Sequence, residues 1–227
     1  MVMEVFVHSD PAAVAAAVAK RIGDDMRSAG ERFTLGLSGG STPIATYEIL
    51  REMTLDWTDV DAWISDERWV GHDHQRSNGR MAEETLIRHV GTRFHRPGWA
   101  DLMDPEEAAS HYESVIRSVH RGHRPDIIHL GMGDDGHTAS LFPDTTALDE
   151  TERWIVANHV PAQGETRITA TYPLLWSART LLVQVTGSAK AEAVRDSMEG
   201  NTPAGRLGEG RAKVEWHLDT DAASLLS

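Results

Sequence analysis

The sequence predicts an α/β fold in which helices cover both faces of a mostly parallel sheet. Short apolar runs typical of strands alternate with longer helical runs along all 227 residues. Strands and helices that alternate in this way form parallel sheets with helices on both faces. Hydrophobic residues make up 40% of the chain, which is enough for a buried core. No repeat or linker divides the sequence, so residues 1–227 are expected to form one domain.

Eight segments have the pattern of strands, and six have the pattern of helices. The expected strands are residues 3–7, 33–37, 60–65, 126–130, 154–158, 168–171, 180–185 and 213–218. The expected helices are residues 11–26, a segment opened by Pro43, 77–89, 105–120, 188–198 and 219–226. Asp10 followed by Pro11 is a typical helix start, and Ser77 is expected to cap the third helix.

Composition and charge exclude several classes of function. The chain has no cysteine, which excludes disulfides, thiolate metal sites and a cysteine nucleophile. The net charge of -13 disfavours nucleic acid as a partner. The N-terminal residues lack the pattern of a signal peptide, and no run approaches the roughly 20 apolar residues that span a bilayer. We expect a soluble, cytoplasmic protein without nucleic acid or membrane partners.

A glycine- and hydroxyl-rich loop follows the second expected strand. Gly39 and Gly40 allow a tight turn close to a ligand, and Ser41 and Thr42 add hydroxyl groups. The helix opened by Pro43 would present free N–H groups and the positive end of its dipole, which suit a phosphate group. The lysine of a Walker A loop is missing, which disfavours nucleoside triphosphates. Taken alone, an ordinary glycine turn with a helix cap explains this loop equally well.

A second glycine-rich loop, GMGDDGHTASLFP at residues 131–143, follows the strand 126–130. His137 lies two residues after Asp135, and a histidine held by a carboxylate is suited to act as a general base. The alternative is a loop histidine among solvated aspartates. The three glycines and the position after a buried strand favour a catalytic role for His137, held by Asp135 or by another aspartate that the fold brings near.

Cationic side chains also occur near strand ends. A chain with a net charge of -13 would need such groups to bind an anionic substrate. Arg68 and Asp66 follow the third strand, Arg167 lies near a strand start, and Lys190 lies where a strand leads into a helix. Each alone is more commonly a surface charge. Ligands of such sheets bind beyond the carboxyl ends of the strands, so we expect these groups to converge there. The HDH at residues 72–74 lacks a third ligand nearby, so we interpret it as a solvated loop and expect no metal.

Six motifs in this order resemble the glucosamine-6-phosphate isomerase/6-phosphogluconolactonase family, and specifically its 6-phosphogluconolactonases. They are SGGSTP at 38–43, SDERWV at 65–70, SN at 77–78, the block at 131–143, RIT at 167–169 and TGSAKA at 186–191. The resemblance covers nearly the whole chain. It implies a Rossmann-like fold shared with glucosamine-6-phosphate deaminase and ribose-5-phosphate isomerase. It also implies hydrolysis of 6-phosphoglucono-δ-lactone to 6-phosphogluconate without a metal or another cofactor.

The resemblance also implies roles for individual residues. The phosphate would be held by Gly40, Ser41, Thr42, Arg167 and Lys190. His137 would activate water, and Asp66 and Arg68 would line the sugar and the reacting carbonyl. Gly71 departs from the proline usual in this family, and the tail after Pro203 is unlike the pattern. We expect a phosphosugar lactone as the only partner and a monomer as the working form.

Three other classes of function are open to this sequence. An isomerase or deaminase of an amino-sugar phosphate typically has tyrosine after the Asp-Glu pair and a glutamate just beyond the Asp-Gly-His block. Arg68 takes the tyrosine place here, and SLFP at 140–143 offers no glutamate. A sugar-phosphate sensor would need a DNA-binding module, for which the residues before the first loop leave no room. A metal hydrolase lacks convincing ligands.

Overall fold

A seven-stranded parallel sheet forms the centre of the computed structural model, which describes residues 3–30, 32–100 and 103–226. The order of its strands is β1-β10-β9-β6-β2-β3-β5. These strands are β1 (Met3–His8), β2 (Phe33–Leu37), β3 (Val60–Ile64), β5 (Arg93–His95), β6 (Ile127–Leu130), β9 (Thr180–Val185) and β10 (Lys213–Asp219). A smaller antiparallel sheet has the order β4-β8-β7, with β4 at Asp66–Arg68, β8 at Glu165–Ala170 and β7 at Ile155–Val160.

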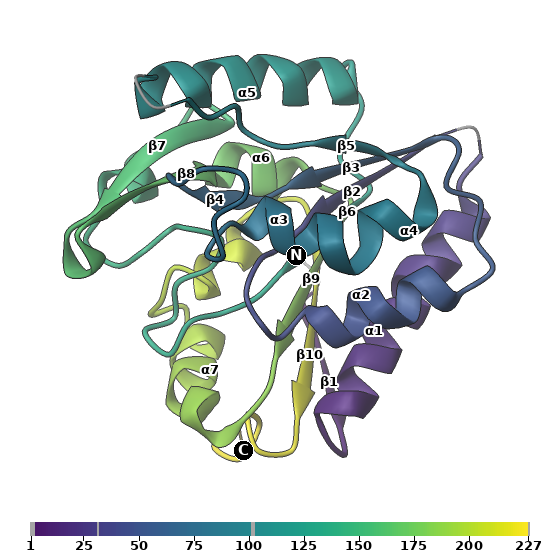
Figure 1. Cartoon of the computed structure of the whole chain (residues 1–227). Helices are drawn as coiled ribbons and strands as arrows, with labels where there is room; N and C mark the ends of the chain where they lie inside the picture. Colours follow the sequence, from purple (N-terminus) through teal and green to yellow (C-terminus); the bar gives the residue numbers. More distant parts are fainter. Residues whose placement is uncertain (1–2, 31, 101–102, 227) are drawn as a thin grey trace.

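Helices pack on both sides of the parallel sheet. They are α1 (Pro11–Ser28), α2 (Ile44–Glu52), α3 (Asn78–Ala82), α4 (Arg88–Val90), α5 (Pro105–His120), α6 (Tyr172–Ser177) and α7 (Ala191–Met198). Figure 1 shows α1 and α2 on one side of the strands and α6 and α7 on the other. This arrangement confirms the predicted fold class. Within the described part of the chain, no helix has the length and apolar character needed to cross a membrane.

Local sequence signals explain where the helices begin. The Asp10 carboxylate accepts a hydrogen bond from the Ala13 N–H at 2.9 Å, and Pro11 is the first residue of α1. Ser77 likewise accepts from the Arg80 N–H at 3.0 Å and caps α3. Both predicted starts are confirmed. The third expected helix is divided, because a π-helical turn over Glu83–Ile87 separates α3 from α4.

The structure corrects two expectations and adds three elements that were not predicted. The chain after β10 forms turns instead of a helix over residues 219–226. Asp219 ends β10, and its carboxylate accepts from the N–H groups of Gly187 and Ala222, which bends the chain there. The strand expected at residues 168–171 is the longer β8, so Arg167 lies inside a strand instead of near its start. The short strands β4 and β5 and the helix α6 were not predicted.

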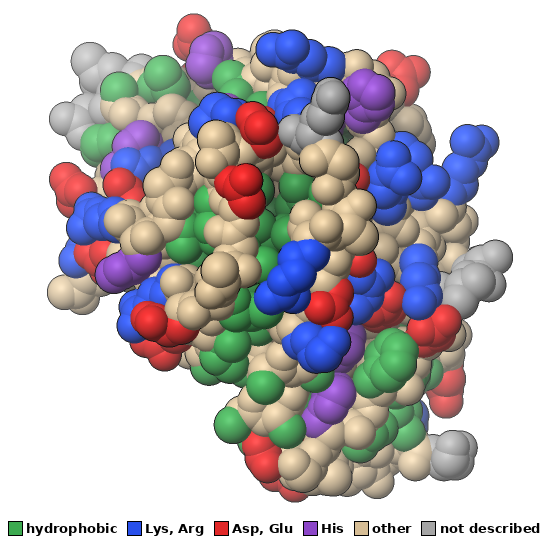
Figure 2. All heavy atoms as spheres, turned by 90° about the vertical axis from the view of Figure 1, so that its right-hand side faces the viewer, with side chains coloured by type: hydrophobic (Ala, Val, Ile, Leu, Met, Phe, Trp, Pro, Cys, Tyr) green, Lys and Arg blue, Asp and Glu red, His purple; other side chains and the backbone are tan. Residues whose placement is uncertain are grey.

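Charges of both signs are mixed over the surface that lies to the right in Figure 1. Figure 2 shows this face with Lys and Arg side chains interspersed among Asp and Glu. The net charge of -13 is therefore not gathered into a single acidic patch on this face. An anionic substrate does not meet a uniformly repulsive surface on this side of the molecule.

One histidine is buried in the aromatic part of the core. His120, at the end of α5, is 1% exposed and lies edge-on to Trp63 and Trp154, with ring centroids 5.9 and 5.8 Å away. Neither of its ring nitrogens has a hydrogen-bond partner among the described residues. Burial lowers the pKa of His120 to about 4. The folded state therefore disfavours the protonated form of this side chain.

We expect the His120→Leu variant to lose less stability in acid than the unmodified protein. An unfolded histidine titrates near its ordinary pKa of 6.5, so between there and pH 4 the unfolded state binds more protons. Stability falls as pH falls through this window, by about 2 kcal/mol from pH 7 to 5 for one such group. Urea unfolding at these two pH values measures the loss. The variant His111→Leu, at an exposed position of the same helix, should keep the full pH dependence. Equal losses in His120→Leu and the unmodified protein would contradict the expectation.

Candidate active site

A cleft of about 290 Å³ lies where the loops after β2, β3 and β6 meet. These loops follow the carboxyl ends of neighbouring parallel strands, as expected for ligand sites in such sheets. Of the ten site residues predicted from the sequence, all but Asp135 line this cleft. The nine lining residues are Gly39, Gly40, Ser41, Thr42, Asp66, Arg68, His137, Arg167 and Lys190.

The loop after β2 is held rigidly at its base. The Tyr47 hydroxyl accepts from the Ser38 N–H at 2.9 Å and donates to the Ser38 carbonyl at 3.0 Å. Burial raises the pKa of Tyr47, so its hydroxyl remains a donor at neutral pH. Gly40 has a φ of 90°, which a residue with a side chain rarely adopts. The loop then enters α2 at Ile44, the expected geometry for an anion site.

His137 is paired with Asp135, as its sequence neighbourhood suggested. The distance from His137 Nδ1 to Asp135 Oδ1 is 2.5 Å, and the same oxygen accepts from the His137 N–H at 3.0 Å. Burial alone would raise the pKa of Asp135, but the hydrogen bonds and charge of His137 outweigh it and lower the pKa. Because Asp135 accepts at Nδ1, the neutral ring leaves Nε2 as its free basic nitrogen.

Packing also fixes the plane of the His137 ring. The ring stacks on Phe142, with centroids 3.9 Å apart and an interplanar angle of 24°. A Cβ atom on Gly133 would lie 2.1 Å from His137 Nδ1, so only glycine fits there. Asp135, Phe142 and Gly133 therefore hold the imidazole from three sides. A ring fixed in this way is prepared to take a proton at one defined position.

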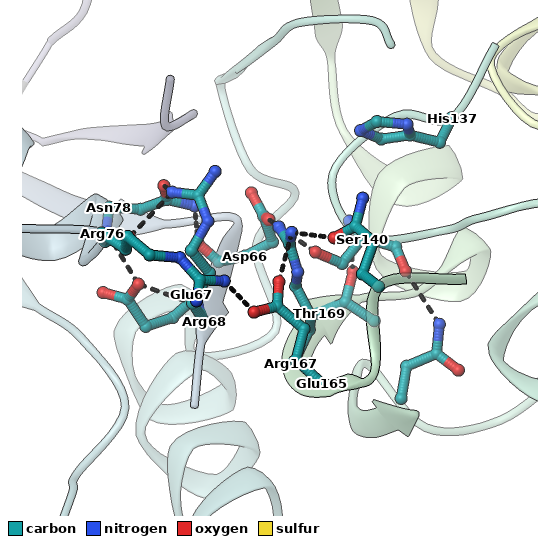
Figure 3. A network of polar contacts seen from close by, with 12 residues as sticks. Asp66, Glu67, Arg68, Arg76, Asn78, His137, Ser140, Glu165, Arg167 and Thr169 are labelled. Atoms are coloured by element: carbon teal, nitrogen blue, oxygen red, sulfur yellow. Dashed lines mark hydrogen bonds and ion pairs between the residues drawn. The ribbon is translucent and has the colours of Figure 1, made fainter. Parts of the chain in front are cut away.

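Asp66 and Arg167 form a buried charged pair between the adjacent strands β4 and β8 of the antiparallel sheet. Asp66 accepts from the Ser140 hydroxyl at 2.6 Å, and its Oδ2 lies 3.8 Å from Arg167 Nη1. Arg167 also pairs with Glu165, with Nη2 and Oε1 2.6 Å apart. Burial lowers the pKa of Arg167, and the charges of Asp66 and Glu67 oppose that effect. Figure 3 shows this network beside His137.

Two residues to which the sequence assigned no role, Asn78 and Glu67, hold Arg68 in place. Its Nη1 donates to Asn78 Oδ1 at 2.5 Å and to the Arg76 carbonyl at 2.8 Å. Asn78 also lines the cleft, and Glu67 beneath it is 5% exposed. Asn78 belongs to the SN motif, which is the only sequence signal for it. Glu67 gives no local signal, because alternation along β4 turns it away from Asp66 and Arg68.

Lys190 reaches the cleft from the segment after β9. It ends a short 3₁₀ turn over Ser188–Lys190 that leads into α7, and its side chain lines the cleft. Gly187, with a φ of 94°, turns the chain there after β9. Lys190 and the glycine-rich loop therefore line the same cleft, although the two segments are far apart in sequence.

The histidines at residues 72 and 74 contact backbone groups. His72 Nε2 lies 2.9 Å from the Pro97 carbonyl oxygen, and His74 Nδ1 accepts from the Arg76 N–H at 3.1 Å. Within residues 3–30, 32–100 and 103–226, no three His, Asp or Glu side chains gather in a group that could hold a metal ion.

Residues 9–216 match the family model described as glucosamine-6-phosphate isomerases/6-phosphogluconolactonase. The chain belongs to this family. The 6-phosphogluconolactonase of Synechocystis sp. is 37% identical over 206 residues, which are 85% of this chain and 84% of its own length. The 6-phosphogluconolactonase of Mycobacterium leprae is 32% identical over 99% of this chain and 98% of its own length. The resemblance seen in the sequence is confirmed.

Solved structures of this family share the fold of the chain. A 6-phosphogluconolactonase from Shewanella baltica is 27% identical, with a TM-score of 0.82 over 96% of this chain and 97% of its own. A monomeric glucosamine-6-phosphate deaminase has a TM-score of 0.86 over 98% and 100% at 23% identity. The second likeness concerns the fold alone, so one fold accommodates both activities.

Proposed function

We propose that this protein hydrolyses 6-phosphoglucono-δ-lactone to 6-phosphogluconate in the oxidative pentose phosphate pathway. The observation that carries the proposal is a general base and a phosphate-suited loop on one cleft. His137, fixed by Asp135, supplies the base, and the loop Gly39–Thr42 supplies the anion site. The relatives named 6-phosphogluconolactonase, alike along most of their length, support lactone hydrolysis.

His137 carries the proton transfers in this proposal. Its Nε2 takes a proton from water as the water oxygen attacks the lactone carbonyl carbon. The resulting tetrahedral oxyanion re-forms the carbonyl, the ring C–O bond breaks, and the protonated imidazole returns its proton to the leaving ring oxygen. Asp135 stabilises the imidazolium that exists between these two transfers. General base and acid catalysis of this kind contributes about 10²–10⁴-fold in rate.

Arg68 is the group that we favour for stabilising the tetrahedral oxyanion. The alternative is the set of backbone N–H groups in the loop 133–136. Two of these four N–H groups are already used, since that of Gly133 donates to the His137 carbonyl and that of Gly136 donates to the Gly133 carbonyl. The Arg68 guanidinium lines the cleft and keeps further donors beyond those bonded to Asn78 and Arg76. One donor aimed at an oxyanion is worth about 3 kcal/mol.

The phosphate is held by the loop Gly39–Thr42 together with Lys190 and Arg167. Lys190 offers a compact charge, whereas Arg167 is shared with Asp66 and Glu165. The lactone ring lies between this site and His137, with Asp66 placed to accept from a sugar hydroxyl. The proposal needs no metal or other cofactor, and the whole chain acts as one domain and as a monomer, since one chain supplies all these groups.

A rate measurement with two substrates tests the proposal. Formation of 6-phosphogluconate should exceed the spontaneous hydrolysis of the lactone, and glucosamine 6-phosphate should release no ammonia. Arg68 in the place of tyrosine and the absence of glutamate in residues 140–143 favour this outcome over deamination. Ammonia release without lactone hydrolysis would overturn the proposal and assign the chain to the other activity of its family.

A further inference from the structure

Asn78 stands between Arg68 and the glycine-rich loop. Its side chain is 2% exposed, although it lines the cleft. Oδ1 accepts from Arg68 Nη1 at 2.5 Å, and Nδ2 donates to the Asp66 carbonyl at 2.8 Å. Both ends of the amide are therefore committed to the β4 segment, and they fix the direction in which the Arg68 guanidinium leaves it (Figure 3).

A buried carboxylate holds Asn78 in this position. Glu67 Oε1 accepts from the N–H groups of Asn78 at 2.7 Å and Arg68 at 2.8 Å. Oε2 accepts from the Gly79 N–H at 2.7 Å and the Ser77 hydroxyl at 2.9 Å. Burial raises the pKa of Glu67, and these four donors oppose that rise. A buried carboxylate is costly unless its oxygens are bonded, so this site is built to hold the turn 77–79 against β4.

The other face of Asn78 packs against the glycine-rich loop. A Cβ atom on Gly39 would lie 1.9 Å from both Cγ and Oδ1 of Asn78, and 2.4 Å from its Nδ2. The φ of Gly39 is not in the left-handed region, so this contact is what demands a glycine there. Asn78 thus joins the loop that we assign to phosphate and the arginine that we assign to the oxyanion.

We propose that Asn78 is a positioning residue that aims the Arg68 guanidinium into the cleft and sets its distance from the phosphate loop. The inference rests on the lactonase function proposed above. The lactone ring sets the distance between the reacting carbonyl at C1 and the phosphate on C6, so the two sites must stand a matching distance apart. Asn78, held by Glu67, is the side chain that spans them.

A double-mutant cycle on kcat tests the link between Asn78 and Arg68. We expect Asn78→Ala to lower kcat by about 10-fold in the unmodified protein. In the Arg68→Ala background the same change should lower kcat by less than about 2-fold, because the group that Asn78 positions is gone. Equal fold losses in both backgrounds would overturn the proposal, since a purely structural role does not depend on Arg68.

A second cycle tests the contact with the phosphate loop. Gly39→Ala should displace the Asn78 side chain and lower kcat by about as much as Asn78→Ala, roughly 10-fold. In the Asn78→Ala background the added methyl group has room, so Gly39→Ala should cost less than about 2-fold. A full loss from Gly39→Ala in both backgrounds would show that the methyl group acts elsewhere and would contradict the contact.

Thr34→Val is the matched control for both cycles. It removes a buried hydrogen bond to Asp126 from the far end of β2, so it should lower the thermal midpoint and leave kcat unchanged. Thermal unfolding of every variant distinguishes a loss of folded protein from a displacement of the Arg68 guanidinium. Calorimetric binding of 6-phosphogluconate separates the two proposals. If the unmodified protein binds 6-phosphogluconate but does not hydrolyse the lactone, the lactonase proposal fails. The same two double-mutant cycles, measured as changes in the affinity for 6-phosphogluconate, then decide the role of Asn78.

Discussion

Replacement of His137 by alanine is expected to lower kcat for the lactone by about 10²–10⁴-fold. Nε2 of this ring is the basic nitrogen that faces the cleft once Asp135 holds Nδ1. The phosphate loop, Lys190 and Arg167 are untouched by the change, so binding of 6-phosphogluconate should stay within about 3-fold of the unmodified protein. Steady-state rates corrected for spontaneous hydrolysis, together with calorimetric binding, measure both quantities.

Asp135→Asn is the matched variant for this prediction. The amide oxygen still accepts from Nδ1–H, but the negative charge that stabilises the imidazolium is lost. We expect a loss in kcat smaller than that of His137→Ala. A rate for His137→Ala close to that of the unmodified protein would remove the histidine from the mechanism. Unchanged kcat in Asp135→Asn alone would leave His137 as the base and reduce Asp135 to an anchor.

The parallel sheet and the convergence of its loops could be predicted because their signals are local. The strand over Thr180–Val185 is a nearly continuous apolar run, and its residues are all buried in β9. The strand β4 contains only Asp66, Glu67 and Arg68, and such a charged segment has no hydrophobic pattern. It becomes a strand because it pairs with β8, which is a tertiary contact. Local patterns therefore indicated β7 and β8 but neither β4 nor its pairing with β8 in the antiparallel sheet.

The same distinction applies to the site. Glycines and a histidine crowded after a strand indicate a functional loop, and the topology rule places such loops on one cleft. The roles of Asn78 and Glu67 depend on which side chain fills the space beside Gly39 and on where a buried carboxylate finds its donors. Those facts exist only once the loops after β2 and β4 have come together. The SN motif drew attention to Asn78, but it did not indicate which groups the Asn78 side chain contacts.

Lys190→Ala is expected to raise KM for the lactone by about 10–100-fold with little change in kcat. A charge-assisted hydrogen bond to phosphate is worth about 1.5–3 kcal/mol, which corresponds to this range. The phosphate is bound alike in the ground state and the transition state, so its loss appears in KM. Rates at a series of lactone concentrations measure the change. Lys20→Ala, at an exposed lysine of α1 that pairs with Asp24, is the control and should leave KM unchanged.

Arg167 should behave differently, although it is assigned to the same phosphate. Its removal leaves Asp66 and Glu165 without their shared cation, so Arg167→Ala should lower the thermal midpoint as well as raise KM. Lys190→Ala should affect KM alone. If Lys190→Ala leaves KM unchanged while Arg167→Ala raises it, the phosphate lies on the β8 side of the cleft. The substrate would then be turned within the cleft, and His137 would face a different carbon of the sugar. The pair of variants therefore tests the orientation of the substrate on which the assignment of His137 depends.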